Sequence, residues 1–460
     1  MDGRWRGRGE PVVPRLALAL FSAHVVIALA LIPPWQQFDE PTHVTRVEWE
    51  VSRITRLDGA RDPGREAEIL YSLARYDWWG HRRPGGRTPT PFPKDFFSAA
   101  VQSGDDGVGS QASAESTLTP YPLIAGRVLS WLPRSTVVAD LYVLRIISAV
   151  LGALTLWVAW LGARECLGAF GGAVVAFLLA LHPQFAIVST TASPDAMVNL
   201  LGAGVWWQTA AAVKRNRVLM PLAAVWAIAI AAASTDRMGA PLLAFAILAS
   251  AVAVAEQVRA GRRPLAFPIL AATAAGIAAF GVALRILNPI SEEYFSRILT
   301  GGWAPIPGTI SWNHLVSFMS YIHQSWWFSL GWGGRYLPSS WWIAVVAVLI
   351  ALAALGAGRR LLRSNEADHR ISTLIALAVV GVAIQTLAVY WAHFRLGIGA
   401  QGRYFFPFLV PSLVLLWYGV EAWVPQSRRQ YAAAALVLVF AVLDAAAWVL
   451  VAIPAYSTSL

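Results

Sequence analysis

The chain has 460 residues, of which 57% are hydrophobic and only 13% are charged. Soluble domains contain roughly 45–50% apolar residues, so this composition excludes an ordinary water-soluble globular protein. The net charge is +10, but the basic residues lie mostly at the ends of apolar runs and form no nucleic-acid motif, so we expect no nucleic-acid partner. A single cysteine, Cys166, excludes an intrachain disulfide and a multi-cysteine metal site.

The apolar residues come in runs whose length matches the roughly 20 residues that a helix needs to cross a membrane. The first run, 16–32, follows a basic start and precedes no small-residue cleavage site, so we interpret it as a retained anchor. The other runs follow in order: 137–163, 168–190, 196–213, 218–234, 238–256, 265–286, 340–357, 371–393, 404–423 and 431–453. The sequence therefore predicts an all-α integral membrane protein with about eleven transmembrane helices.

The basic residues gather at alternate ends of these runs. They are Arg164, Lys214, Arg215, Arg217, Arg259, Arg262, Arg263, Arg359, Arg360, Arg363, Arg370, Arg428 and Arg429. Because basic loops stay in the cytoplasm, the N-terminus (1–32 with its anchor) is predicted to be cytoplasmic, and the loops 33–136 and 287–339 extracytoplasmic. Spans two to seven then occupy 137–286 and spans eight to eleven 340–460, which places the C-terminus outside. Only two of the 36 basic residues are lysine, and this usage, typical of GC-rich coding, favours a bacterial plasma membrane.

The first long loop, 33–136, opens with an amphipathic segment near 43–57. Its apolar and charged positions recur at helical spacing on opposite faces: Val44, Val47, Val51 and Ile54 against Arg46, Glu48, Glu50, Arg53 and Arg56. This pattern predicts a helix lying at the membrane surface. Residues 80–118 are rich in Pro, Gly and Ser and are predicted to be flexible, and 121–132 is predicted to be a second surface helix.

Three acidic residues are candidates for catalysis. Asp39 and Glu40 directly follow the first span, where desolvation is expected to raise their pKa values towards those of a general base. Asp195 follows Ser193-Pro194 in a short turn on the same side of the membrane. The alternative is that all three only cap or begin helices. A metal site built from Asp39, Glu40 and His43 lacks a familiar ligand spacing.

The basic candidates also lie at the outer side. Arg145 falls inside an apolar run, where an arginine is costly unless it pairs with an anion such as Asp140 or a phosphate. Arg403, next to Tyr404, lies at the mouth of a later span, and Arg237 adjoins Asp236 at another outer turn. The alternatives are interfacial anchoring and, for Arg237, pairing with its neighbour.

Two further features are open to a structural or a functional interpretation. The chain has 22 Trp, and those near 326–342 fit an interfacial aromatic belt, although some would also suit stacking on sugar rings. Asp444 is an isolated acid deep in the last run, either in a proton relay or hydrogen bonded to a neighbouring helix.

Four segments together resemble a known bacterial family. They are PPWQQFDEPTH (33–43), TPYPLIAG to LYVLRIIS (119–148), TASPDAMVNLLGA (191–203), and WFSLGW and LPSSW with QGRYFFPFLVP (327–341, 401–411). In this order they resemble the predicted membrane proteins called domain of unknown function 2142. That family in turn is similar to the GT-C glycosyltransferase superfamily, whose multi-spanning enzymes take a sugar from a polyprenyl-phosphate carrier outside the cytoplasm. Ser234-Thr235-Asp236-Arg237 departs from the family's usual Ser-Lys.

The resemblance implies roles for the candidate residues. Asp39, or Glu40, would be the general base that deprotonates the acceptor hydroxyl, and Asp195 would orient the acceptor or a metal. Arg145 and Arg403 would hold the lipid phosphate, with His43, Arg237 and Tyr404 as further substrate contacts. No cofactor is certain, and a divalent cation (Mg²⁺ or Mn²⁺), if present, would use Asp39 and Asp195. The expected partners are a polyprenyl-phosphate-linked sugar, a glycan, lipid or protein acceptor, and the bilayer.

Two other function classes remain open at this point. A transporter or lipid flippase predicts inverted repeats and ionisable residues at the membrane midplane, and Arg145 and Asp444 keep it under consideration. A non-catalytic scaffold would have kept the fold and lost the chemistry, but the presence of both Asp39 and Asp195 speaks against it. The clustering of charged candidates at the outer side favours the glycosyltransferase.

Overall fold

The computed structural model describes residues 12–55, 62–76, 78, 119–215, 218–259, 261, 275–276, 278, 312–331, 340–363, 369–396 and 401–457. The regular elements of this part of the chain are helices, as the sequence predicts. Their bounds are α1 Val12–Leu31, α2 Glu40–Thr55, α3 Pro63–Arg75, α6 Pro120–Ser130, α7 Val137–Ala180, α8 Pro183–Val188, α9 Asp195–Lys214, α10 Leu219–Thr235, η1 Arg237–Gly239, α11 Pro241–Arg259, α14 Trp312–Trp327, α15 Ser340–Leu362, α16 His369–Leu396, η4 Gly402–Phe408, α17 Leu409–Glu421, η5 Gln426–Arg428, α18 Arg429–Ala446, the π-helical η6 Ala447–Ala452 and α19 Ile453–Ser457.

Seven helical segments in this described part are long and apolar enough to cross a membrane. They are Val12–Leu31, Val137–Ala180, Arg237–Arg259, Trp341–Leu362, His369–Phe394, Gly402–Glu421 and Gln426–Tyr456. The predicted total of about eleven includes α9 and α10, which are not among these seven, and the run 265–286, which lies almost entirely outside the described residues. The total therefore stays a prediction.

The 44-residue α7 is two helices merged across a kink at Gly168, and it covers the region of the second predicted span and the start of the third. Gly168 has φ 79°, a left-handed conformation that glycine adopts readily. The chain folds back on itself at this glycine. The evidence is that Gly172 lies against Arg164, eight residues earlier: a Cβ on Gly172 would be 3.0 Å from the Arg164 backbone. The sequence places the break between spans two and three at this position.

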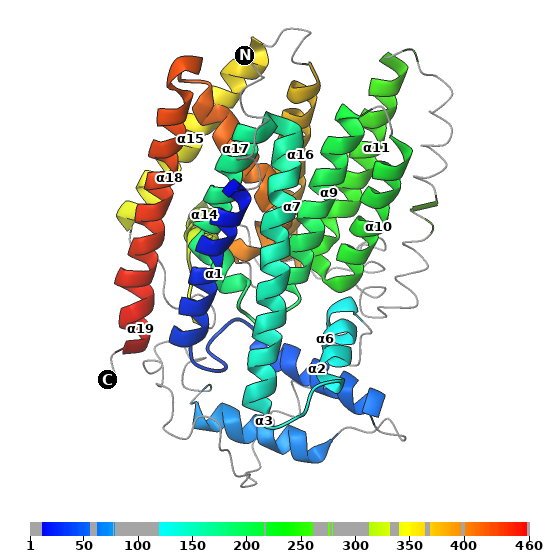
Figure 1. Ribbon diagram of the computed structural model, residues 1–460, viewed down its shortest axis with the longest axis vertical. Coiled ribbons are helices and arrows are strands. Elements are labelled where there is room, and N and C mark those ends of the chain that lie inside the picture. The colour runs from blue at the N-terminus through cyan, green and yellow to red at the C-terminus, as the bar shows by residue number, and fades with distance from the viewer. Residues whose placement is uncertain are drawn as a thin grey trace.

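The helices form two layers (Figure 1). Most stand side by side as an upright bundle, and α2, α3 and α6 gather below it, with α2 and α3 lying across its lower end. The predicted amphipathic helix is present as α2, but Val44, Val47 and Val51 are fully buried in a cluster with residues of α3, α6 and α7. Neighbouring protein helices cover this apolar face, and the position of α2 at the membrane surface stays a prediction. The predicted second surface helix is present as α6, whereas the flexible segment 80–118 lies outside the described residues.

Two of the tryptophans expected in an aromatic belt are buried instead. Trp327 and Trp342 are each 2% exposed, whereas Trp341 is 50% exposed. Trp327 stacks on His182, which begins α8, at a ring distance of 5.2 Å. Trp327 therefore holds the end of α14 against the start of α8.

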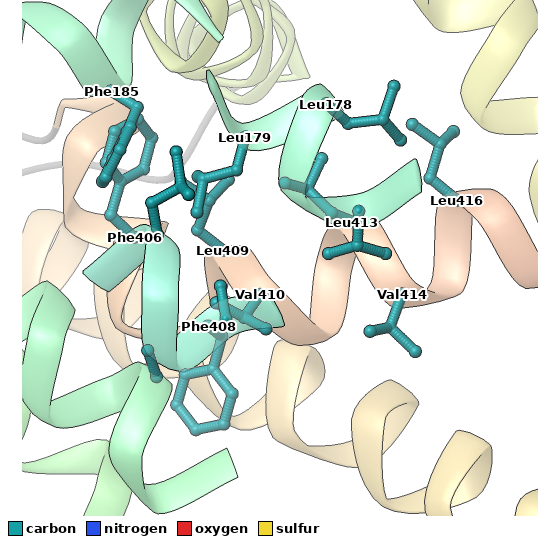
Figure 2. Packing of buried hydrophobic residues seen from close by; sticks show 14 of the residues in the cluster. Leu178, Leu179, Phe185, Phe406, Phe408, Leu409, Val410, Leu413, Val414 and Leu416 are labelled. Carbon is teal, nitrogen blue, oxygen red and sulfur yellow. The ribbon is translucent and has the colours of Figure 1, made fainter. Parts of the chain in front are cut away.

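The core fixes the position of the turn η4. Figure 2 shows Phe406 and the first turns of α17 packed against Leu178, Leu179 and Phe185, which belong to α7 and α8. Gly202 of α9 lets the backbone of η4 approach closely, since a Cβ there would collide with the Pro407 carbonyl. This contact fixes the segment that carries Arg403.

Candidate functional site

Asp39 lies in a constrained turn between α1 and α2. Its φ is 54°, and that of Trp35 in the same turn is 66°, in a region that non-glycine residues seldom adopt. Such conformations cost about 1–3 kcal/mol each and persist only where the surroundings hold them. The Asp39 carbonyl accepts a hydrogen bond from His43 N (3.1 Å), so α2 begins here, while the carboxylate points towards η4. The turn therefore aims the acid away from its own helix.

Arg403 joins the two predicted catalytic aspartates. Its Nη2 donates a hydrogen bond to Asp39 Oδ2 at 2.6 Å, and its Nη1 makes an ion pair with Asp195 Oδ2 at 2.9 Å. The arginine side chain is 3% exposed, Asp195 17% and Asp39 39%. Three segments that are far apart in sequence thus meet at one buried guanidinium, and Asp39 is the more accessible acid.

The pKa of Asp39 is lowered, which corrects the expectation that burial would raise it. Burial by itself does raise the pKa of this carboxyl group, but the positive charge and hydrogen bond of Arg403, with a smaller contribution from Arg237, outweigh it. Asp39 is therefore a carboxylate at neutral pH. It is a weaker base than the sequence suggested.

A ring of further charged groups surrounds this centre. Burial lowers the pKa of His43 to about 3, so its imidazole is neutral and offers no positive charge to a phosphate. The Asp236 carboxylate accepts a hydrogen bond from Met238 N (2.8 Å), and no ion pair joins it to Arg237 among the described residues. Arg237 is exposed and acts electrostatically on Asp39. It is thus a cation at the rim of the centre.

Arg46 belongs to the same ring, although the sequence assigned it only to the polar face of α2. The charges of Asp236, Arg237 and Asp39 all act on its guanidinium, which is partly buried. His43 and Arg46 are spaced i and i+3 on α2, so they share one side of the helix that starts directly after Asp39. That spacing is the signal that identifies Arg46 from the sequence.

Glu40 and Arg145 are brought together, but away from open space. Nε and Nη2 of Arg145 bind the two carboxylate oxygens of Glu40, each at 2.8 Å, and its Nη1 and Nη2 donate to the carbonyls of Ile32 (2.8 Å) and Pro33 (2.9 Å). Both side chains are 0% exposed. Asp140, the partner suggested by the sequence, instead pairs with Arg134 (2.8 Å). The Glu40–Arg145 pair therefore holds the turn that carries Asp39, and this geometry favours neither a phosphate contact for Arg145 nor a base role for Glu40.

Asp444 makes a contact between helices, the structural one of the two roles considered from the sequence. Its Oδ2 lies 2.6 Å from His24 Nε2 of α1, and its Oδ1 accepts a hydrogen bond from Trp448 Nε1 at 3.1 Å. The group joins α1 to α18 and η6 and includes none of the residues around Arg403. It forms a separate feature inside the bundle.

Several buried polar atoms beside the centre lack a hydrogen-bond partner. Ser193 Oγ and Asn199 Nδ2 flank Asp195, Gln401 Oε1 lies two residues before Arg403, and Arg403 Nε is also unpaired. Similar atoms occur elsewhere in the described part of the chain, such as His24 Nδ1 and Trp206 Nε1, so these four are available to a ligand but do not by themselves mark a site.

The carboxylates do not present an open metal site. No group of three or more His, Cys, Asp or Glu within the described ranges is arranged to hold a metal ion. Asp39 and Asp195 are the proposed ligands, but each already contacts Arg403. A divalent ion at this position would have to displace that guanidinium.

Comparison with family models shows which protein family the chain belongs to. The family model described as predicted membrane protein, DUF2142, matches residues 23–411. The chain belongs to this family. No curated protein matches the sequence.

Solved structures similar to this DUF2142 chain include the oligosaccharyltransferase of Archaeoglobus fulgidus. The apo form has a TM-score of 0.48 and 12% identity, and the alignment covers 98% of this chain and 56% of that one. The form in complex with an inhibitory peptide and a dolichol-phosphate has a TM-score of 0.46 and 13% identity, covering 96% and 55%. The chain spans about half the length of these structures. Because both TM-scores are below 0.5, the likeness does not establish a shared activity.

The part of the DUF2142 chain covered by the family match includes every residue of the centre. Segment 33–43 supplies Asp39 and His43, segment 191–203 supplies Asp195, and segment 401–411 supplies Arg403 and Tyr404. The short motifs that carry the resemblance in sequence are thus the segments that converge in space.

Proposed function

We propose that this protein is a membrane glycosyltransferase that moves a sugar from a polyprenyl-phosphate carrier to an extracytoplasmic acceptor. The observation that carries the proposal is the accessible, ionised carboxylate of Asp39, held by Arg403 and surrounded by two cations, Arg46 and Arg237. An acid that accepts a proton beside cations that attract a phosphate is the pairing that glycosyl transfer from a lipid phosphate needs.

The reaction is a single inverting displacement. The acceptor hydroxyl oxygen attacks C1 of the sugar from the side opposite the phosphate, and the bond between C1 and the phosphate oxygen breaks. Its electron pair leaves with the phosphate, and the hydroxyl proton passes to Asp39. A weak base suffices if this transfer is late, because the hydroxyl becomes strongly acidic once its oxygen bonds to C1.

The arginines have other roles here than the resemblance implied, which assigned the lipid phosphate to Arg145 and Arg403. Arg403 is engaged by the two aspartates, so in this proposal it positions them, and Arg46 and Arg237 meet the charge that develops on the leaving phosphate. Asp195 and the unpaired polar atoms beside it orient the acceptor. Tyr404 packs its ring against Arg403 at 5.4 Å and lines the same centre.

Transfer by purified protein in nanodiscs tests the proposal, with radiolabelled polyprenyl-phosphate sugars as donors and a membrane extract as acceptor. We expect Asp39→Asn to lower the transfer rate by at least about 100-fold, which is the size of a general-base contribution, while the variant still binds the carrier. Glu66→Gln, which removes a carboxylate from α3 in the same outer layer, is the matched control and should keep full transfer. Unchanged transfer by Asp39→Asn would contradict the proposal.

A proton-coupled transporter is the second candidate, because the buried His24–Asp444 pair lies among the membrane helices. Uptake of a labelled precursor into proteoliposomes that depends on Asp444 and not on Asp39 would favour it. The glycosyltransferase predicts the reverse dependence.

A further inference from the structure

We propose that Arg403 replaces a divalent cation in this centre, so that the site works with a guanidinium of the chain itself between its two carboxylates. This inference deepens the proposed function, on which it rests only for the role of the centre in catalysis. The contacts themselves are independent of any activity.

The carboxylates of Asp39 and Asp195 contact two different nitrogens of the Arg403 guanidinium. Asp39 Oδ2 lies 2.6 Å from Nη2, and Asp195 Oδ2 lies 2.9 Å from Nη1. The first contact is a charge-assisted hydrogen bond and the second is an ion pair, so each acid is engaged by its own nitrogen of the guanidinium. The guanidinium therefore occupies the place between the acids.

Arg403 is held firmly in this place. It is 3% exposed, and its guanidinium lies 4.5 Å from the ring centre of Phe38 and 5.4 Å from that of Tyr404. The preceding Gly402 N donates a hydrogen bond to Ser325 Oγ at 2.8 Å, and a Cβ on Gly402 would collide with the backbone of Trp326. The backbone that carries the arginine is thus locked against α14.

The positive charges around the two acids oppose a metal ion while Arg403 is in place. Arginine stays protonated in proteins, so a divalent ion would meet a fixed positive charge within the same pair of acids. Arg46 and Arg237 add two more positive charges nearby. In the described ranges no third carboxylate, cysteine or histidine joins Asp39 and Asp195 in an arrangement that would hold an ion.

The arrangement also explains what Arg403 contributes. It neutralises one of two neighbouring negative charges, fixes the direction of both carboxylates and leaves Asp39 with an exposed side for the acceptor. A metal ion would supply the same fixed positive charge, so the guanidinium removes the need for one.

Binding of Mn²⁺, followed by electron paramagnetic resonance in protein purified with EDTA and then freed of chelator, tests the inference without any sugar substrate. We expect no binding to the wild type that depends on Asp39. Arg403→Ala and Arg403→Gln remove the guanidinium and should gain Mn²⁺ affinity by at least about tenfold, and adding Asp39→Asn to either should abolish the gain. Arg237→Ala, which removes a nearby positive charge but neither carboxylate contact, is the control and should not gain a site.

Two results would overturn the inference. One is Mn²⁺ binding to the wild type that Asp39→Asn abolishes, because the acids would then hold a metal with Arg403 in place. The other is that neither Arg403 variant gains binding although both remain folded by thermal unfolding, because the guanidinium would then not be what excludes the ion. Neither readout uses sugar transfer, so failure of the proposed function is seen separately, in the transfer assay.

Discussion

At the scale of single residues, the chemistry of the centre depends on how Arg403 changes Asp39. Burial raises the pKa of the Asp39 carboxyl group, and the adjacent guanidinium more than reverses that effect. The net lowering keeps Asp39 ionised, and so able to accept a proton, at pH values where an ordinary aspartate would begin to protonate. The sequence places both residues at the outer face but gives no sign that they touch.

The pH dependence of transfer tests this coupling. In the wild type the fall in kcat/KM on the acid side should lie below the ordinary aspartate range, because the pKa is lowered. Arg403→Gln removes the largest lowering influence and leaves burial, which raises the pKa, so the acid-side fall should move to higher pH. Profiles of kcat/KM measured with EDTA present check this shift, which is separate from any loss of rate. An unchanged acid limb would mean that Arg403 does not control the ionisation of Asp39.

At the scale of elements, the approach of η4 to α9 brings Arg403 within reach of Asp195. This approach depends on Gly202, where a Cβ would meet the Pro407 carbonyl and push the turn away. Gly204, two residues later on α9, faces only the Ile228 side chain at 3.4 Å, an ordinary contact. The two glycines are thus a matched pair on one helix.

Gly202→Ala should lower the free energy of unfolding by about 1–3 kcal/mol, the usual cost of overpacking, and should also lower transfer because η4 carries Arg403. Gly204→Ala should leave both close to the wild type. Thermal unfolding in detergent, together with the transfer assay, measures the two effects. Equal behaviour of the two variants would show that close packing of η4 on α9 does not position the centre.

The sequence predicted where the helices are better than it predicted which residues contact each other. Apolar run lengths predicted α1, α9, α10, α11, α15 and α16 to within a few residues. The amphipathic pattern of α2 predicted a helix but not which molecules pack on its apolar face. Periodicity shows that one face is apolar, but it does not show whether lipid or protein contacts that face. Likewise, Arg145 inside an apolar run required an anionic partner, but the choice of Glu40 over Asp140 depends on how the turn after α1 folds back.

At the scale of the whole molecule, the site needs one particular orientation in the membrane. The layer of α2, α3 and α6 lies at one end of the bundle, next to Asp39, and α1 runs down the bundle towards this layer (Figure 1). An ion-pair network of Arg65, Arg134, Glu48 and Asp140 ties this layer to the start of α7. The distribution of basic residues predicts that this end faces outwards. A lipid-linked sugar donor would then be met on the extracytoplasmic side.

Labelling of single cysteines in intact cells tests that orientation. Cys166 is buried, and replacing it with alanine gives a background without native thiols. Trp131, 75% exposed at the end of α6, and Leu362, 90% exposed at the end of α15, lie at the predicted outer and inner ends. A membrane-impermeant maleimide should label Trp131→Cys in intact cells and Leu362→Cys only after the membrane is opened. The opposite pattern would put Asp39 and Arg403 on the cytoplasmic side, where an extracytoplasmic acceptor cannot reach them, and would rule out the proposed reaction in that form.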